Sequence, residues 1–423
     1  MTGLIRSLWS LMERLVPRAS SSLLMLLLAW RTSPEIVGLY VWGVLAYTFV
    51  GSLTDATMRQ LVVSALRSDK GVELIRAYRR LVVVLGPLVL LLFFLVLWLV
   101  SGPDHKSAVL TLLPLALGPA FMAVNIFNIG RLQGQHEWRA LATGQLVASL
   151  AAMTVGVPLV LLLTNPSGAA IGTVLGELVM MLWCWNATRR LEPYTPVKIR
   201  SRRLLREYRS MAAYSGLAWG QGQTDRVFVG AVAGGHTLGV LSLGISLARA
   251  LGDAVAASSA NLLRAELASA DTAERAAVGR AVLRRGMFLA AATAFLTAAV
   301  AKWILSPILG EEWSPALEIV PILSLCVIPS VLSWSAAIYH VDAATGKKAL
   351  IGPIASIFIA LPVATLSFWS LPALAVGVVL REFTLVTVAY FALGPTAPWR
   401  SLGQAVLLTS GLFVVVLVVS VAG

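Results

Sequence analysis

The sequence predicts an all-α membrane protein: a polytopic helical bundle of two six-helix lobes around a central cavity, with one extra helix at the C-terminal end. Three observations predict this fold class. Hydrophobic residues make up 58% of the 423 residues and charged residues only 13%, which leaves too little polar surface for a water-soluble domain. Apolar stretches of roughly 20 residues, the length that crosses a bilayer core of about 30 Å, recur along the chain. The two halves of the chain also share aligned glycine and glutamate positions.

Thirteen helices are predicted in chain order. The first follows an amphipathic segment that contains Leu4, Ile5 and Leu8 beside Arg6. This start does not have the pattern of a cleavable signal peptide, so we expect the N-terminus to stay in the cytoplasm. Six helices form each half of the chain, and the thirteenth follows them. The predicted helices cover about residues 8–31, 36–58, 79–101, 107–131, 138–163, 168–187, 211–233, 237–261, 286–309, 315–343, 348–368, 371–393 and 402–422.

The basic residues gather on one side of this map. All but six of the 33 Lys and Arg residues fall in connections that the map assigns to the same side of the membrane. This is the positive-inside pattern, and it accounts for the net charge of +13 without a nucleic-acid partner. We therefore expect a multi-pass protein of the bacterial inner membrane. The six exceptions are Arg31, Lys106 and Lys302 on the outer side, and Arg226, Arg249 and Arg381 within helices.

The longest hydrophilic stretch, residues 189–209, divides the chain into two halves of six helices each. Its cluster of basic side chains is typical of a cytoplasmic loop that fixes topology at a lipid surface. The predicted segments are an N-terminal lobe at 1–190, a basic cytoplasmic linker at 191–210, a C-terminal lobe at 211–393 and an extra transmembrane helix at 394–423.

Two internal alignments relate the halves. Residues 38–52 align without a gap to residues 239–253, which relates the second predicted helix to the eighth. The segments AIGTVLGE (170–177) and AVGVVLRE (375–382) relate the sixth helix to the twelfth. Because an even number of helices separates each pair, the repeat is parallel, with its axis along the membrane normal. The cleft between the lobes is then the expected place for a substrate.

Three stretches resemble the polysaccharide (O-antigen type) flippase family of the multidrug/oligosaccharidyl-lipid/polysaccharide exporter superfamily. They are SPEIVGLYVWGVLAYTFVGSLTDATMRQL at the second helix, TDRVFVGAVAGGHTLGVLSLGISL at 224–247, where Leu241 replaces the family's usual Tyr, and LGEEWSPALEIVPILSL at 309–325. The resemblance implies a transporter and not an enzyme. It would flip a polyprenyl-pyrophosphate-linked oligosaccharide to the outer leaflet by alternating access. Membrane lipids and polysaccharide assembly proteins would be its partners. The thirteenth helix departs from the family's usual even count.

Two arginines within apolar segments are the candidate substrate-binding residues. A charge at the bilayer centre costs about 2.5–3.5 kcal/mol even on a lenient scale, so such a residue is a functional candidate. Arg226 and Arg249 lie at similar predicted depth, and a guanidinium binds a phosphate with two parallel hydrogen bonds. The structural alternative is internal neutralisation: Asp253 is four residues after Arg249, and Asp225 adjoins Arg226.

Four acids are candidates for coupling transport to an H⁺ or Na⁺ gradient, because an intramembrane carboxyl group can take up either ion. A structural role is an equal alternative for Glu382, whose neighbour Arg381 is charged. The four candidates are Asp225, Glu177, Glu382 and Asp253.

No cofactor or metal is expected. Cys184 and Cys326 lie in apolar segments, the four histidines have no zinc spacing, and no phosphate-binding loop motif occurs. Catalytic Ser-His-Asp or Cys-His patterns are also lacking. Besides the flippase, three readings remain open: a cation-coupled drug or metabolite antiporter of the same superfamily, a membrane glycosyltransferase or polymerase, and a non-transporting scaffold. The antiporter would need a cavity dominated by acids and aromatic residues.

Overall fold

The computed structural model describes residues 3–56, 72–135, 137–191, 201–269, 274–342, 348, 350–394 and 397–421. Every regular element in these ranges is helical. The chain forms two compact units, an N-terminal unit from Met1 to Trp219 and a C-terminal unit from Gly220 to Gly423. Residues 192–200 of the expected linker lie outside the described residues.

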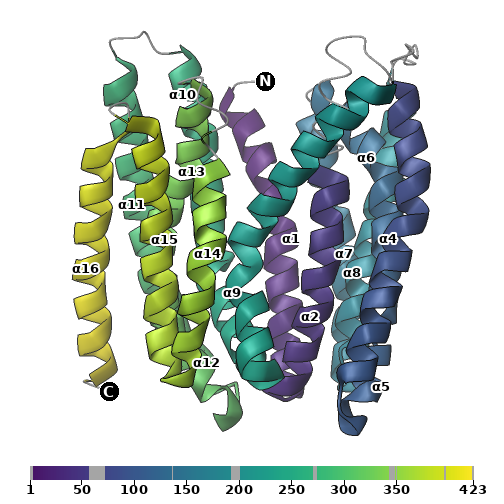
Figure 1. Ribbon diagram of the computed structural model, residues 1–423, viewed down its shortest axis with the longest axis horizontal. Helices are drawn as coiled ribbons and strands as arrows, with labels where there is room; N and C mark the ends of the chain where they lie inside the picture. Colours follow the sequence, from purple (N-terminus) through teal and green to yellow (C-terminus); the bar gives the residue numbers. More distant parts are fainter. Residues whose placement is uncertain are drawn as a thin grey trace. The chain divides into compact units, whose positions relative to one another are not determined.

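The N-terminal unit contains seven labelled α-helices and the first part of α9. In this unit α7 and α8 lie side by side along most of their length (Figure 1). Short 3-10 and π-helical turns interrupt or extend several of the elements. The helices are α1 (Gly3–Arg31), α2 (Pro34–Gly51), α4 (Val72–Val100), α5 (Lys106–Leu110), α6 (Gly118–Gly134), α7 (Trp138–Leu163) and α8 (Ser167–Thr188).

The C-terminal unit begins within α9 (Ser201–Ala250). Its apolar core lies among α10, α11, α13, α15 and α16, where Leu263, Met287, Val331 and Val386 are fully enclosed. The following helices are α10 (Gly252–Ser269), α11 (Arg275–Val300), α12 (Ser314–Ser324), α13 (Val327–Asp342), α14 (Ile351–Thr365), α15 (Leu371–Leu393) and α16 (Trp399–Val421).

Nine helices of the described residues are long and apolar enough to cross a membrane, or ten if one bent pair counts as a single span. Large apolar side chains are exposed on these helices, including Leu92 at 62% and Leu162 at 78%. Such surfaces are stable in lipid and not in water. The chain is therefore a multi-pass helical membrane protein, as the composition predicts.

Proline explains one difference from the predicted helices. The segment expected as one helix at 315–343 is two helices, α12 and α13, which meet at an angle of 51°. Pro329, the third residue of α13, has no N–H to donate to the carbonyl of Leu325, and its ring clashes with that carbonyl in a continuous helix. The apolar pattern runs unbroken across this bend, so it predicts one span.

Two glycines of the apolar helices act differently. At Gly172 on α8 an added Cβ would lie 2.8 Å from the carbonyl oxygen of Ala152 on α7, so the glycine permits close backbone contact. At Gly234, by contrast, nothing lies within 4 Å of such a Cβ, and the backbone has φ 83° and ψ −178°. Only glycine adopts this conformation readily. Gly234 therefore ends one helix and starts another within α9, between the predicted seventh and eighth helices.

Candidate functional site

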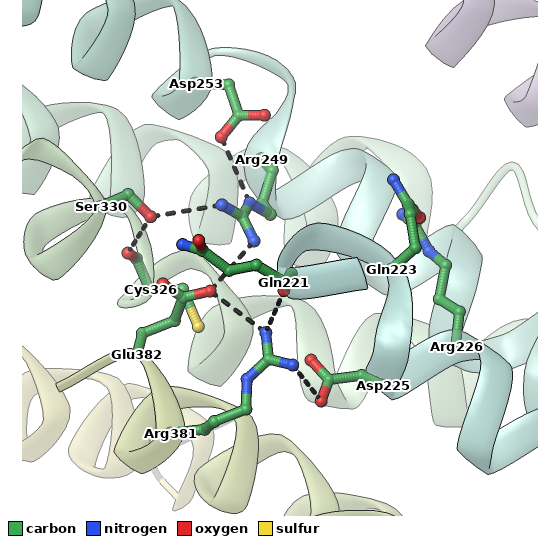
Figure 2. A network of polar contacts seen from close by, with 10 residues as sticks. All are labelled: Gln221, Gln223, Asp225, Arg226, Arg249, Asp253, Cys326, Ser330, Arg381 and Glu382. Atoms are coloured by element: carbon green, nitrogen blue, oxygen red, sulfur yellow. Dashed lines mark hydrogen bonds and ion pairs between the residues drawn. The ribbon is translucent and has the colours of Figure 1, made fainter. Parts of the chain in front are cut away.

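Six ionisable side chains gather in the C-terminal unit, within segments of otherwise apolar helix (Figure 2). They come from the consecutive helices α9 and α10 and from α15, which is far from them in sequence. Asp225, Arg226 and Arg249 lie on α9, Asp253 lies in the first turn of α10, and Arg381 and Glu382 lie on α15. All five site residues predicted in this half of the chain thus lie in one region. Arg381, which was not among the predicted site residues, lies there too.

Arg381 is the most deeply buried member, with 1% of its surface exposed. Its Nη1 donates to Oδ1 of Asp225 at 2.6 Å, and its Nη2 donates to the main-chain oxygen of Gln221 at 3.3 Å. The same Nη2 lies 3.3 Å from Oε1 of Glu382. A buried charge is tolerated when it is paired and hydrogen-bonded in this way. Arg381 therefore links α15 to α9.

Arg249 is the second linking residue. Its Nε lies 3.2 Å from Oδ1 of Asp253, one helical turn further along the chain. Its Nη1 reaches Oε1 of Glu382 at 3.4 Å, and its Nη2 donates to Oγ of Ser330 on α13 at 3.3 Å. One oxygen of Glu382 therefore accepts from two arginines, as Figure 2 shows. We call Asp225, Arg249, Asp253, Ser330, Arg381 and Glu382 the C-terminal network.

Arg226 lies apart from these ion pairs. Its Nη1 donates to Oε1 of Gln223 at 2.7 Å, and its buried Nε has no hydrogen-bond partner in the described part of the chain. Asp225, its sequence neighbour, pairs with Arg381 instead. Successive residues of a helix point in different directions, so adjacency does not make a pair. Within the described ranges, no carboxylate lies within 4.0 Å of the Arg226 guanidinium.

The formal charges of the C-terminal network do not cancel. Arg249 and Arg381 supply two positive charges, whereas Asp225, Asp253 and Glu382 supply three negative charges. An excess carboxylate in a low-dielectric region attracts a further cation or a proton. The network therefore has the composition of a site that can take up one positive charge. In the described ranges no group of three or more His, Cys, Asp or Glu side chains is arranged to hold a metal ion.

Glu177, the remaining predicted site residue, lies on α8 of the N-terminal unit and has different surroundings. Oε1 of Glu177 accepts a hydrogen bond from the hydroxyl of Tyr47 on α2 at 3.2 Å. The residue also lines a cavity of about 280 Å³ between α1, α7 and α8.

Sequence reasoning recognised Arg381 only as an intramembrane charge beside Glu382, and it did not identify Gln221 or Ser330. The lone arginine in an apolar segment was the available signal for Arg381. Its partner Asp225 is 156 residues away, and no local spacing indicates such a pair.

Comparison with known proteins agrees with this architecture. The fold resembles the lipid II flippase MurJ in an inward closed conformation, with a TM-score of 0.73 and 13% identity over 99% of this chain and 93% of that one. An inward-facing multidrug resistance MATE family transporter of the MOP superfamily gives 0.66 and 12% identity over 93% and 95%. A MOP superfamily transporter from Pyrococcus furiosus gives 0.61 and 14% identity over 96% and 95%. No sequence among the curated proteins matches this chain.

The fold defines a multi-pass helical membrane protein whose architecture is similar to that of the transporters and the flippase named above. A family model described as polysaccharide biosynthesis protein matches residues 27–318. The chain belongs to this family of polysaccharide biosynthesis proteins, in agreement with the resemblance seen in its sequence.

Proposed function

We propose that the protein flips a polyprenyl-pyrophosphate-linked oligosaccharide from the cytoplasmic to the outer leaflet of a bacterial inner membrane by alternating access. Its N-terminus would lie in the cytoplasm. The family match to polysaccharide biosynthesis proteins and the flippase-like fold support this choice of substrate class. A pyrophosphate and its sugars cannot cross hydrocarbon alone, because each unsatisfied polar group costs several kcal/mol there.

Arg226 is the observation that carries the proposal. It is a guanidinium inside a candidate membrane span, and none of the described carboxylates lies within ion-pair distance of it. A charge at this depth is expensive, so a ligand that pairs with it directly would bind there. A pyrophosphate has both the charge and the geometry for two parallel hydrogen bonds from one guanidinium.

Arg249 and the acids take different proposed roles. Asp253, Glu382 and Ser330 already accept from three nitrogens of Arg249, so this arginine would position the network and reach the substrate only by exchanging partners. The excess acid in the C-terminal network would take up a proton or Na⁺ and so couple transport to an ion gradient. Glu177 is the corresponding candidate in the N-terminal unit, where Tyr47 orients its carboxylate.

The same excess acid favours one alternative, a cation-coupled drug or metabolite antiporter. In that case a cationic substrate would bind the acids, and Arg226 would repel it. The two functions therefore make opposite predictions for Arg226. Its removal should abolish flipping of an anionic substrate and should preserve or increase export of a cation.

The test is a surface-polysaccharide assay in cells that depend on this protein. Arg226→Ala should reduce surface polysaccharide at least about tenfold, which corresponds to a loss of roughly 1.4 kcal/mol in binding, and should accumulate the lipid-linked sugar on the inner face. Arg226→Lys should retain partial export because the charge survives without the planar fork. Arg280→Ala, at an exposed arginine of α11, is the matched control and should export normally. Normal export by Arg226→Ala at normal protein level would refute the proposed role.

A further inference from the structure

The N-terminal unit contains a polar cavity that the proposed pyrophosphate site does not use. It has a volume of about 280 Å³ and lies between α1, α7 and α8, within a single unit. Arg18 of α1, Gln145 and Ser149 of α7, and Thr173 and Glu177 of α8 contribute polar groups to its wall. Polar walls are unusual inside an apolar bundle, because each buried polar group needs a hydrogen-bond partner.

Two of these side chains have no partner from the protein. Neither Gln145 nor Ser149 makes a side-chain hydrogen bond to any described residue, although Ser149 is only 6% exposed. Thr173 differs, since its Oγ1 donates to the carbonyl of Ala169 at 2.8 Å. Leaving a buried hydroxyl and a partly buried amide unpaired destabilises the fold, so a polar occupant of the cavity would offset that cost.

The formal charges on the cavity wall balance, which fits a neutral occupant. Arg18 and Glu177 both line the cavity, so their formal charges cancel. The remaining polar groups are hydroxyls and an amide, each of which can both donate and accept hydrogen bonds. A neutral molecule that carries several hydroxyl groups matches this set, because every hydroxyl can act as donor to Glu177 or as acceptor from Arg18.

The size of the cavity and the apolar part of its wall further limit which molecules can occupy it. The volume lies just below the range of about 300–1,000 Å³ that is usual for small-molecule sites, so it fits one ring and not an oligosaccharide. Leu24, Ala148, Ala152 and Met180 form the apolar wall. A sugar ring has the same division, with hydroxyls at its rim and C–H groups on its faces.

We propose that this cavity binds a single neutral sugar ring, and that it serves as a subsite for one residue of the transported saccharide. The role as a subsite for the transported saccharide rests on the proposed function. The binding of a sugar ring does not, since it concerns only the N-terminal unit.

Thermal unfolding of the purified full-length protein in detergent tests the binding. The probes are D-glucose, D-galactose, N-acetyl-D-glucosamine and L-rhamnose, each at the same high concentration, with NaCl as a separate arm. A ligand that binds only the folded state raises Tm. At least one sugar should raise the Tm of the unmodified protein by about 2 °C or more above the rise seen with the other sugars. Sugars also stabilise proteins without binding, so the comparison between variants decides the result.

Ser149→Val removes the unpaired hydroxyl and fills part of the cavity, so it should lose most of the sugar-specific rise. Thr154→Val is the matched control, because it removes a hydroxyl from an exposed position of the same helix, α7, and should keep the full rise. Gln145→Leu provides a second variant in case Ser149→Val does not fold. It removes an amide without leaving a described partner unpaired.

Equal rises in the unmodified protein and both cavity variants, or no sugar-specific rise in any of them, would overturn the proposal. A rise with NaCl alone that disappears in Ser149→Val would identify an ion site and would overturn it as well. These measurements need no transport. If the unmodified protein binds sugar in this cavity and the Arg226→Ala variant exports normally, the sugar-binding proposal stands and the proposed pyrophosphate site is refuted.

Discussion

At the scale of single residues, one carboxylate oxygen shared by two arginines controls how the C-terminal network responds to substitution. Oε1 of Glu382 accepts from Arg249 at 3.4 Å and from Arg381 at 3.3 Å. If one arginine is removed, Glu382 keeps the other. Asp225 has no such reserve among the ion pairs of the described residues, since its one pair joins it to Arg381. The network should therefore fail at Asp225 before it fails at Glu382.

Arg249 offers a direct test of its own ion pairs. Arg249→Ala removes the ion pair with Asp253 and should lower surface polysaccharide roughly tenfold, equivalent to about 1.4 kcal/mol. The double variant Arg249→Ala, Asp253→Ala removes both charges, while Glu382 keeps Arg381, so export should recover substantially. Recovery to the unmodified level would exclude Arg249 from direct substrate contact. Equal loss in single and double variants would instead show that the arginine itself contacts substrate.

Arg381 should matter for stability more than for transport. Arg381→Ala leaves Asp225 buried without its only arginine among the described ion pairs, and removing one partner of a buried pair typically costs about 3–5 kcal/mol. Thermal or denaturant unfolding in detergent would measure this loss. Arg280→Ala, at an exposed position, should change stability by less than about 0.5 kcal/mol. An equally small change in the free energy of unfolding for Arg381→Ala would contradict the structural role of Arg381.

How far the site can be read from sequence depends on the range of each contact. Arg249 and Asp253 are four residues apart, a spacing that brings side chains together on any helix, and the pair is present. Arg381 and Asp225 meet only because α15 packs near α9, which a local pattern does not contain. Arg226 shows the opposite case. Asp225 is next to it in sequence but is not its ion-pair partner, because the side chain of Asp225 pairs with Arg381 on α15.

At the scale of secondary-structure elements, the sequence predicts where long apolar helices lie better than it predicts where those helices bend or break. Long apolar runs predict the membrane-crossing helices well, since lipid demands both helix and length. The bend between α12 and α13 is missed because the run stays apolar on both sides of it. The break at Gly234 falls between two predicted helices, where Gly234 and Gly235 lower helix propensity.

Substitution of Gly234 tests whether this break is stabilised by its backbone conformation. Gly234→Ala places a Cβ on a residue with φ 83°, which should cost about 1–3 kcal/mol even though the surrounding space is open. Gly222→Ala is the control: it also has open space but carries no positive φ and lies within α9. The control should be neutral or stabilising by up to about 1 kcal/mol. Equal unfolding midpoints for the two variants would contradict the strain.

At the scale of the whole molecule, charge distribution should set the orientation in the membrane. The basic stretch at 189–209 favours the cytoplasmic side. A cysteine at Ser201 should therefore react with a membrane-impermeant reagent only after the cells are opened. A cysteine at the exposed Ser107, the first residue of the predicted helix at 107–131 and next to a predicted outer connection, should react in intact cells. The native Cys184 and Cys326 are buried and add little background. Labelling of Ser201→Cys from outside would reverse the assigned topology.

The two-lobe organisation and the parallel repeat remain sequence-based predictions. They rest on glycines such as Gly38 and Gly239, which occur at the same stage of each half. Superposition of the two units should place α2 on the part of α9 that follows Gly234. The helical class, by contrast, follows from composition alone, because a membrane protein of this hydrophobicity must satisfy its backbone within helices.

The shared carboxylate of Glu382 also has an evolutionary consequence. Because Arg381 pairs with both Asp225 and Glu382, losing Arg381 alone leaves Asp225 without its ion pair, whereas losing Asp225 alone leaves Arg381 paired with Glu382. Loss of Arg381 before loss of Asp225 is therefore disfavoured, and Asp225 should be lost first across a lineage. Relatives that lack the arginine at the position of Arg381 should also carry a neutral residue in place of Asp225, whereas Arg226 should vary independently, according to the anion that each relative carries.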